Sequence, residues 1–446
     1  MNTPEQTKPE PRLNRRDFLR TTSAAVAGAS VLGGLSVERS AFAASSDTLK
    51  LALIGCGGRG SGAAAQALST DGPVKLVAMA DAFKDNLDKS LANLQSKCTG
   101  KVEVPPDRQF VGFDAYKQAI ALADVVILAT PPGFRPMQFE EAVKQGKNIF
   151  TEKPVATDPP GVRRFMAAAE ESKKKNLKVV VGLQRHYDEG YRETIKRLND
   201  GQIGDIVAMR AYWNGETPWI HRREELEKAY GHKLTEMEYQ MRNWYYFTWI
   251  CGDHIVEQHI HNLDVINWVK GGHPVRAEGM GGCEVRKGPD YGEIFDHHAV
   301  EFEYEDGSRC ISFCRHIHGC WNSVSEHLVG TKGTCDVGNH IIRGPNQWRF
   351  KKEGIRDPYQ QEHDELFAAI RNNTALNNAD YGASSTMTAI LGRLATYSGK
   401  MVEWDEAMKS NINLFPDKLA WDANPKVMPD ANGMYQLAVP GHTVVV

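Results

Sequence analysis

The sequence predicts an α/β fold in which a doubly wound parallel sheet is followed by a second α/β domain with a largely antiparallel, open sheet. Three observations predict it. Short apolar runs alternate with helical segments up to about residue 182, strand-like alternation of polar and apolar residues follows from about residue 275, and a glycine-rich turn comes directly after the first apolar run.

The glycine-rich turn carries the strongest functional signal. The apolar run 51–54 leads into Gly55-Cys56-Gly57-Gly58-Arg59-Gly60, and an alanine-rich helix is expected next. In this G-x-G-x-x-G context Gly55 makes the turn, Gly57 lets the backbone approach a pyrophosphate, and Gly60 brings helix and strand together. The first N–H groups of the helix then receive the phosphate charge. The turn predicts a dinucleotide site; a merely glycine-rich turn is the alternative.

The second apolar run, 74–80, ends in Asp81, at about the spacing at which a carboxylate binds a ribose diol. A carboxylate there repels a 2′-phosphate, so Asp81 favours NAD as the cofactor. Lys84 lies close enough in the sequence to leave NADP open.

The amino-terminal segment has the pattern of an export signal. It contains Asn14-Arg15-Arg16-Asp17-Phe18-Leu19-Arg20, then the mild apolar stretch 24–35 and the cleavage-site sequence Ala41-Phe42-Ala43. This is typical of a twin-arginine signal peptide, and its apolar run is too short and weak to span a membrane. We therefore expect a periplasmic or otherwise exported protein that engages the twin-arginine export machinery; an uncleaved tail is the alternative.

Composition narrows the class of protein. The chain has 446 residues and a net charge of −3, so no basic surplus indicates binding to nucleic acid or to anionic lipid. Its length predicts more than one domain. Eight cysteines in so long a chain are not a disulfide framework, and Cys310, Cys314 and Cys320 are expected to be mostly buried small side chains, with a disulfide open to them after export.

Regular elements are expected along most of the chain. The run 124–129 is typical of a strand buried on both faces, and further strands are expected at 148–151 and 179–182. Mostly antiparallel strands at 275–285, 297–304, 309–316 and 326–329 follow, with one face open to another subunit. The predicted organisation is a signal peptide at 1–43, a nucleotide-binding domain at 47–182, a substrate and oligomerisation domain at 183–406, and an irregular tail at 407–446.

A second candidate site lies on a helix expected from about Cys251 to Val269. On a regular helix one stripe would carry four polar side chains: His254, Glu257, His261 and Asp264. Two alternatives stay open, namely that the acidic residues orient histidines inside a packed interface, or that His, Glu and His bind a metal ion. Because no paired H-E-x-x-H motif occurs, we expect no metal.

Three ordered motifs together closely resemble the Gfo/Idh/MocA family, which includes glucose–fructose oxidoreductase and inositol dehydrogenase. They are the glycine turn, Ala129-Thr130-Pro131 and Glu152-Lys153-Pro154. The likeness spans about Leu49 to Ser398. It implies a Rossmann domain, a second domain with an open sheet, NAD(P)-dependent chemistry on a sugar or polyol, and a homo-oligomer.

The resemblance also implies site residues. Cofactor contacts fall on Gly55, Cys56, Gly57, Gly58, Arg59, Gly60, Asp81, Thr130, Pro131, Glu152 and Lys153. Lys153 is the lysine beside the nicotinamide and the substrate hydroxyl. The family's D-x-G-x-H-x-x-D helix matches residues 257–264, with His261 at its histidine and Glu257 at its acidic position. His259 stands where the family has glycine and crowds the pocket or adds a contact, and Arg135 stands where it has histidine.

Further substrate contacts are expected in the first part of the second domain. Arg185 and His186 follow the strand 179–182 and either face the crevice or form a solvated loop pair. Aromatic residues either line a sugar site or belong to the core: Trp213, Trp244, Tyr245 and Tyr246.

The chemistry expected is hydride transfer from a secondary hydroxyl of a sugar, polyol or related carbohydrate. It needs a base and a cation at the hydroxyl, and Lys153 and His261 fit these tasks, with Glu257 sharing proton transfer and Glu152 shaping the pocket. Free NAD cannot be assumed outside the cytoplasm, so the cofactor is expected to be bound before export and held tightly. The alternatives are an exported glycoside hydrolase or epimerase with bound NAD and no net redox change, and a binding protein with a vestigial site.

Overall fold

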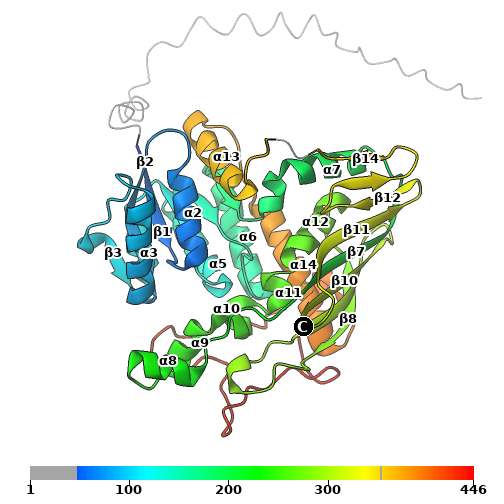
Figure 1. The fold of residues 1–446 in the computed structure, drawn as a ribbon. Coiled ribbons are helices and arrows are strands. Elements are labelled where there is room, and N and C mark those ends of the chain that lie inside the picture. Colours follow the sequence, from blue (N-terminus) through cyan, green and yellow to red (C-terminus); the bar gives the residue numbers. More distant parts are fainter. Residues whose placement is uncertain (1–47, 352–353) are drawn as a thin grey trace, which may run out of the picture. The chain divides into compact units, whose positions relative to one another are not determined.

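The computed structural model describes residues 48–351 and 354–446, and residues 48–446 form one compact unit. The expected fold class is confirmed, since a six-stranded parallel sheet is followed by a nine-stranded, mostly antiparallel sheet (Figure 1). The expected signal peptide lies outside the described residues. Among the described residues, no helix is long and apolar enough to cross a membrane.

The first sheet is wholly parallel, in the order β3-β2-β1-β4-β5-β6. Its strands are β1 (Leu49–Ile54), β2 (Val74–Asp81), β3 (Gln109–Val111), β4 (Val125–Leu128), β5 (Asn148–Thr151) and β6 (Val179–Val181). The order reverses between β1 and β4, and a doubly wound sheet binds ligands at such a point. The short edge strand β3 was not expected from the sequence.

Helices cover both faces of this sheet, because successive side chains of a buried strand point to opposite faces. One face packs against α2 (Gly58–Leu68), α3 (Lys84–Lys97) and α13 (Pro358–Asn372). The other packs against α4 (Ala115–Ala121), α5 (Arg135–Lys144), α6 (Pro159–Lys174) and α14 (Ala379–Ser398). Helices α13 and α14, from the last quarter of the chain, therefore complete the core of the first sheet.

The second sheet has the order β14-β13-β12-β11-β7-β10-β9-β8-β15, and within it only β7 and β10 pair in parallel. Its strands are β7 (Ile206–Gly215), β8 (Arg276–Gly282), β9 (His297–Glu303), β10 (Arg309–His316), β11 (Ser323–Gly330), β12 (Gly333–Asp336), β13 (Ile341–Arg343), β14 (Trp348–Arg349) and β15 (Val402–Glu403). The remaining helices are α7 (Glu189–Asn199), α8 (Arg223–Tyr230), α9 (Glu236–Arg242), α10 (Thr248–Cys251), α11 (His254–Glu257), α12 (Ile260–Lys270) and α15 (Trp404–Lys409). No helix or strand follows within 410–446.

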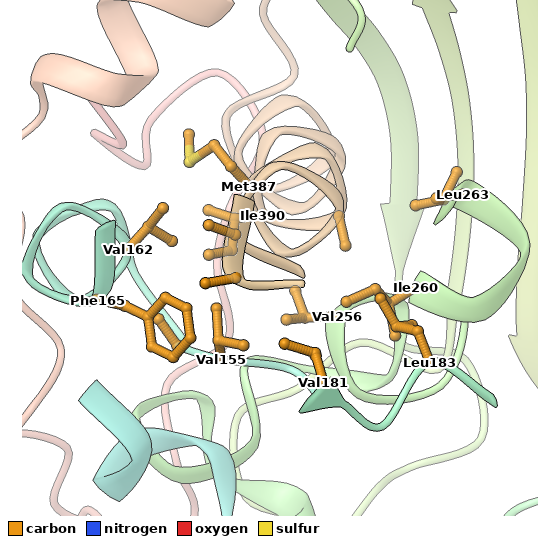
Figure 2. Close-up of a cluster of buried hydrophobic side chains, with 14 of the residues drawn as sticks. Val155, Val162, Phe165, Val181, Leu183, Val256, Ile260, Leu263, Met387 and Ile390 are labelled. Carbon is orange, nitrogen blue, oxygen red and sulfur yellow. The ribbon is translucent and has the colours of Figure 1, made fainter. Parts of the chain in front are cut away.

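One hydrophobic core joins the two sheets through α14. This helix is buried along almost its whole length, as expected for a helix enclosed on all sides. Figure 2 shows Met387 and Ile390 of α14 between Val162 and Phe165 of α6 and the side chains of α11 and α12, including Val256 and Ile260. The two halves of the molecule are therefore held at a fixed separation.

The single helix expected from Cys251 to Val269 is wrong. Gly252 ends α10 with φ of +84°, and Asp253 follows with φ of +77° while its side chain accepts the N–H of His254. A second interruption separates α11 from α12, where the N–H of His259 donates to the carbonyl of His254 instead of to the residue four before it. The stripe expected on one regular helix is therefore divided.

The eight cysteines all lie within the described residues, and all carry free thiols. Cys310 and Cys314 are buried in the core, as expected, whereas Cys320 is exposed.

We predict that Gly60→Ala destabilises the protein whereas Gly62→Ala, in the same helix, does not. A Cβ atom at Gly60 would lie 2.0 Å from the carbonyl oxygen of Gly55, so backbone must move, at a cost of about 1–3 kcal/mol. A Cβ at Gly62 meets only the flexible end of Arg59 at 3.8 Å, and replacing a helical glycine stabilises by up to about 1 kcal/mol. Urea unfolding of both variants measures the difference; equal stabilities would contradict the close approach of turn and helix.

Candidate functional site

A cavity of about 750 Å³ lies between the carboxyl ends of the first sheet and the segments that precede and follow α11. Its walls come from the glycine turn, from the ends of β2, β4 and β5, from α11 and α12, and from the segment between β7 and α10. The site therefore draws on distant parts of the sequence, and each wall has its own chemistry.

The glycine turn fits a pyrophosphate. Nothing lies within 4 Å of the positions where Cβ atoms of Gly57 and Gly58 would stand, so the backbone is open to the cavity. Gly55 has φ of +93°, and a Cβ there would lie 2.5 Å from the backbone nitrogen of Thr130. The turn leads directly into α2, whose first N–H groups have no partners within the helix. A dinucleotide phosphate group matches this donor set.

Asp81 stands where the adenosine ribose is expected. Its two oxygens accept the backbone N–H groups of Cys56 at 2.7 Å and Phe83 at 2.8 Å, which fixes the carboxylate at the end of β2. Burial raises the pKa of Asp81, so hydroxyl donors from a ligand would stabilise its charged form. Lys84, which left the choice between NAD and NADP open, pairs with Asp88 at 2.5 Å. Cys56, expected as a cofactor contact, is buried and does not line the cavity, and its backbone N–H is taken up by Asp81.

Arg59 links the glycine turn to α13. Its guanidinium pairs with Glu152 and, at 2.9 Å, with the fully buried Glu362, and it lies 4.9 Å from the ring centre of Tyr359. Burial, together with the charge of Glu152, raises the pKa of Glu362 well above its usual range. Glu152 therefore shapes the floor of the cavity as one side of a buried ion-pair network.

The turn after β4 is fixed by hydrogen bonds to side chains of α5. The Thr130 hydroxyl donates to Gln138 at 2.6 Å, and both Thr130 and Pro131 line the cavity. Arg135, at the position where the resembled family has histidine, is 1% exposed and donates to the carbonyls of Leu128, Thr130 and Glu152. Burial lowers the pKa of Arg135 to about 10. Its role is to hold the ends of β4 and β5 together.

Lys153 and Glu257 form an ion pair across the cavity, with Nζ 3.0 Å from Oε1. The same ammonium also donates to the backbone carbonyl of Glu257. Both side chains are mostly buried, with 12% and 15% of their surfaces exposed. Lys153 therefore enters the cavity already paired, and not as an isolated amine in an apolar pocket.

His261 lines the same part of the cavity from the first turn of α12. Its ring lies parallel to Trp213 with 5.8 Å between centroids, and its Nδ1 is buried without a partner among the described residues. Burial and the positive charge of Lys153 lower the pKa of His261 well below its usual range, so the imidazole is neutral. A neutral imidazole with a free nitrogen can accept a proton.

His254 and Asp264, the other members of the expected stripe, do not reach the cavity. His254 donates its Nδ1–H to Asp253 at 2.7 Å and is fully buried. Asp264 accepts from His186 at 2.9 Å and from Ser385 at 2.8 Å. Only Glu257 and His261 of the four come together at the cavity wall.

Within the described part of the chain, the one group with metal-ligand geometry is Asp253, His254 and His298. It lies outside the cavity, and it does not include Glu257 or His261. The Asp253 carboxylate already accepts Tyr397 Oη–H at 2.6 Å and Phe295 N–H at 3.0 Å besides the His254 donors. The Asp253 carboxylate is thus already engaged by protein donors, and the stripe of His254, Glu257 and His261 does not come together as a set of metal ligands.

Three expected substrate contacts lie elsewhere. Arg185 pairs with the fully buried Glu326, and His186 lies between Trp268 and Tyr381, with ring centroids 4.0 and 4.1 Å away. His259 is fully buried and bonds Ser312 at 2.7 Å. The correction follows from the turn η3 (Gln184–Tyr187), which directs Arg185 and His186 into the core and presents Gln184 to the cavity instead.

The aromatic residues divide between cavity and core. Trp244 lines the cavity together with Trp219, 5.6 Å away between centroids, which the sequence did not single out. Tyr245 and Tyr246 are buried in the core, and Trp213 packs behind His261. Gln184 was also not singled out from the sequence. In the structure its buried Oε1 has no hydrogen-bond partner among the described residues.

Comparison with known proteins agrees with this geometry. Residues 49–182 match the profile of the Gfo/Idh/MocA family, described as an oxidoreductase family with an NAD-binding Rossmann fold. Residues 49–182 are therefore similar to the NAD-binding Rossmann domain of this family.

Relatives and solved structures extend the likeness. The chain is 24% identical over 265 residues to a 2,7-anhydro-N-acetylneuraminate hydratase of Mediterraneibacter gnavus (57% of this chain, 62% of the relative). It is 28% identical over 233 residues to an inositol 2-dehydrogenase of Burkholderia multivorans (52% and 57%). The matches thus span about three fifths of the length of these curated relatives. A scyllo-inositol dehydrogenase from Lactobacillus casei, solved with NAD(H) and scyllo-inositol, shares the fold with a TM-score of 0.59 at 20% identity, covering 80% of this chain and 99% of that one.

We predict that His363→Met weakens the loss of stability at low pH. The His363 ring lies tilted against Phe150 with 4.2 Å between ring centroids, and neither of its nitrogens has a partner among the described residues. Burial, together with the charge of Arg59, lowers the pKa of His363 well below 6.5. The folded state therefore binds fewer protons than the unfolded state, and the stability that the neutral ring contributes is lost as the pH falls below about 6.5.

Urea unfolding between pH 8 and pH 5 measures this effect, with His442→Met, at an exposed position of the tail, as the control. The free energy of unfolding of H363M should fall less steeply with decreasing pH than that of the wild type. Parallel curves for the two proteins would contradict the prediction.

Proposed function

We propose that the protein is an NAD-dependent oxidoreductase that acts on a secondary hydroxyl of a sugar, polyol or related carbohydrate. The observation that carries the proposal is the convergence of Lys153, Glu257 and His261 on the cavity that also contains the glycine turn and Asp81. A bound nicotinamide would accept or return a hydride at this place. The inositol dehydrogenase relative supports a polyol as substrate.

The chain's own residues supply the proton chemistry. The Lys153 ammonium, fixed by Glu257, is a donor for a substrate oxygen and stabilises negative charge that develops there. The neutral His261, which lines the cavity, is the group that we assign to accept the hydroxyl proton. Gln184 and Trp244, which both line the cavity, can orient a carbohydrate by hydrogen bonding and by contact with an apolar ring face.

The second candidate is a reaction without net redox change, such as hydration, epimerisation or glycoside hydrolysis. Oxidation of one hydroxyl acidifies the neighbouring C–H, which permits elimination before the hydride is returned. Three proton-transfer groups in one cavity suit such a sequence, and the hydratase relative supports it.

We predict that Lys153→Ala lowers kcat by about 10²–10⁴-fold, the usual contribution of a positioned acid–base group. One assay follows the reduced cofactor by its absorbance at 340 nm with inositols and aldoses as substrates. A second assay, without added cofactor, measures product release from p-nitrophenyl glycosides and 2,7-anhydro-N-acetylneuraminate. The control is Lys174→Ala, a surface lysine on α6 whose side chain is 69% exposed.

Unchanged turnover in K153A, with NAD binding intact by calorimetry, would refute the assignment of Lys153. Turnover only in the assays without added cofactor would favour the second candidate over net oxidation.

Export and assembly remain proposals. Amino-terminal sequencing of the mature protein tests cleavage after Ala43 by the twin-arginine route. The open face of the second sheet supports a homo-oligomer, because Tyr212 of β7 stacks there on Phe313 of β10 and both Ile311 and Phe313 are exposed. Light scattering of the wild-type protein in solution tests the oligomer.

A further inference from the structure

Asp253 has a backbone conformation that is almost confined to glycine. Its φ is +77° and its ψ is 160°, a combination that L side chains rarely adopt. The residue is fully buried and stands directly before α11, the short helix that carries Glu257. A strained residue persists only where its surroundings hold it in place, and such residues cluster at active sites. Glycine would adopt this conformation without strain, so the contribution of Asp253 lies in its carboxylate.

The carboxylate joins α11 to two distant elements. One of its oxygens accepts the backbone N–H and the Nδ1–H of His254, the latter at 2.7 Å. The other oxygen accepts the backbone N–H of Phe295 at 3.0 Å and the hydroxyl of Tyr397 at 2.6 Å. His298 Nε2 lies 3.3 Å from the same oxygen. Because Tyr397 belongs to α14, and His298 to β9, the start of α11 is fixed to both.

A second anchor holds the residue before it. The carbonyl of Gly252 accepts a hydrogen bond from Arg393 of α14 at 2.9 Å, and Arg393 is only 2% exposed. Gly252 and Asp253 are thus both bound to α14, the helix at the centre of the core.

The backbone of Asp253 carries this anchoring to the cavity. Its carbonyl accepts the N–H groups of Val256 and Glu257, each at 2.9 Å. The Lys153 ammonium in turn donates to the backbone carbonyl of Glu257 and lies 3.0 Å from its carboxylate oxygen Oε1. A continuous path of hydrogen bonds therefore leads from Tyr397 through Asp253 to Lys153, although Asp253 is not among the residues that line the cavity.

We infer that Asp253 is a positioning residue for the reaction, because it holds Glu257 where both the carbonyl and the carboxylate of Glu257 meet the Lys153 ammonium. The inference rests on the proposed function of Lys153 as a donor to a substrate oxygen. An ammonium has three N–H groups, and two of those of Lys153 are taken up by Glu257. The direction of the third, which is left for the substrate, is then set by the place of Glu257.

The first test is Asp253→Gly, which removes the carboxylate and leaves a residue suited to the positive φ. We expect kcat to fall by about 10–100-fold, because small displacements of a positioned group are costly, while KM and the affinity for NAD stay unchanged. The assay uses whichever inositol, aldose or p-nitrophenyl glycoside the wild type turns over, and calorimetry measures NAD binding.

A double-mutant cycle shows whether Asp253 acts through Glu257. If it does, the loss of kcat in the variant D253G/E257Q is smaller than the product of the losses in D253G and E257Q alone. A merely structural role would give independent losses that multiply.

Chemical labelling of Lys153 gives a readout that needs no turnover. An amine reacts with acetic anhydride only in its unprotonated form, and the extent of reaction at pH 8 is measured by mass spectrometry of the peptide that contains Lys153. We expect faster labelling in Asp253→Gly than in the wild type, because the ammonium loses the acceptors that stabilise it.

The matched control is Asp158→Gly, the same change at another buried aspartate. Asp158 is 4% exposed, caps α6 and accepts the N–H groups of Gly161 at 2.7 Å and Leu414 at 2.8 Å, and it does not line the cavity. Its kcat and its labelling of Lys153 should equal those of the wild type. If Asp253→Gly does not fold, Tyr397→Phe replaces it, since it removes one donor to the carboxylate and should act less strongly in the same direction.

Unchanged kcat and unchanged labelling of Lys153 in Asp253→Gly, or losses that multiply in the double variant, would overturn the inference and leave the oxidoreductase proposal intact. A wild-type protein that turns over none of the substrates would instead count against the proposed function, and the labelling rates would still decide whether Asp253 holds the pair of Lys153 and Glu257.

Discussion

Helix α14 packs between the two sheets and fixes how the end of β5 faces α11 and α12. Its apolar side chains contact α6 on one side and α11 and α12 on the other, so one continuous core spans both halves of the molecule. Side chains in such a core are close-packed and resist displacement. The end of β5, which carries Lys153, and the segment that carries Glu257 and His261 are therefore held in register across more than a hundred residues of sequence.

Charges around the cavity are paired before any ligand arrives. Arg59 pairs with both Glu152 and Glu362, Lys153 pairs with Glu257, and Arg242 pairs with Asp85. Pairs this poorly exposed to solvent have fixed directions, so the polar groups that face the cavity need little reorganisation when a reacting group develops charge. His261 stays outside this pairing and is neutral because burial and Lys153 disfavour its protonated form.

The first sheet could be predicted from the sequence because its signals are local. Apolar runs alternate with helical segments, and Gly55 and Asp81 stand directly at the ends of apolar runs. Each of these signals can be recognised from a few neighbouring residues. The edge strand β3 was missed because three residues carry no periodic pattern, and β12 to β14 were missed for the same reason. The break between α10 and α11 escaped prediction because Asp253 has a positive φ that only its capping of His254 and its buried partners explain.

Of the residues singled out from the sequence, those at the sheet ends line the cavity, whereas some that tertiary contacts draw into the core do not. Lys153 follows directly from β5, and Glu257 and His261 reach the cavity although the helix beneath them is broken. Arg185 and His186 follow a strand in the same way, but Glu326 and the rings of Trp268 and Tyr381 draw them inward. Arg242 and Tyr230 lie on polar helices with no motif, and only the fold brings them to Asp85.

The position of α14 late in the chain has a consequence for biosynthesis. Until residues 379–398 leave the ribosome, β6 and α6 expose the apolar surface that α14 will cover, so the nascent nucleotide-binding half is an incomplete, aggregation-prone intermediate. A chain built in this way cannot finish its amino-terminal half during translation. Its maturation is a single late event, and chaperones have the whole period of synthesis in which to engage it.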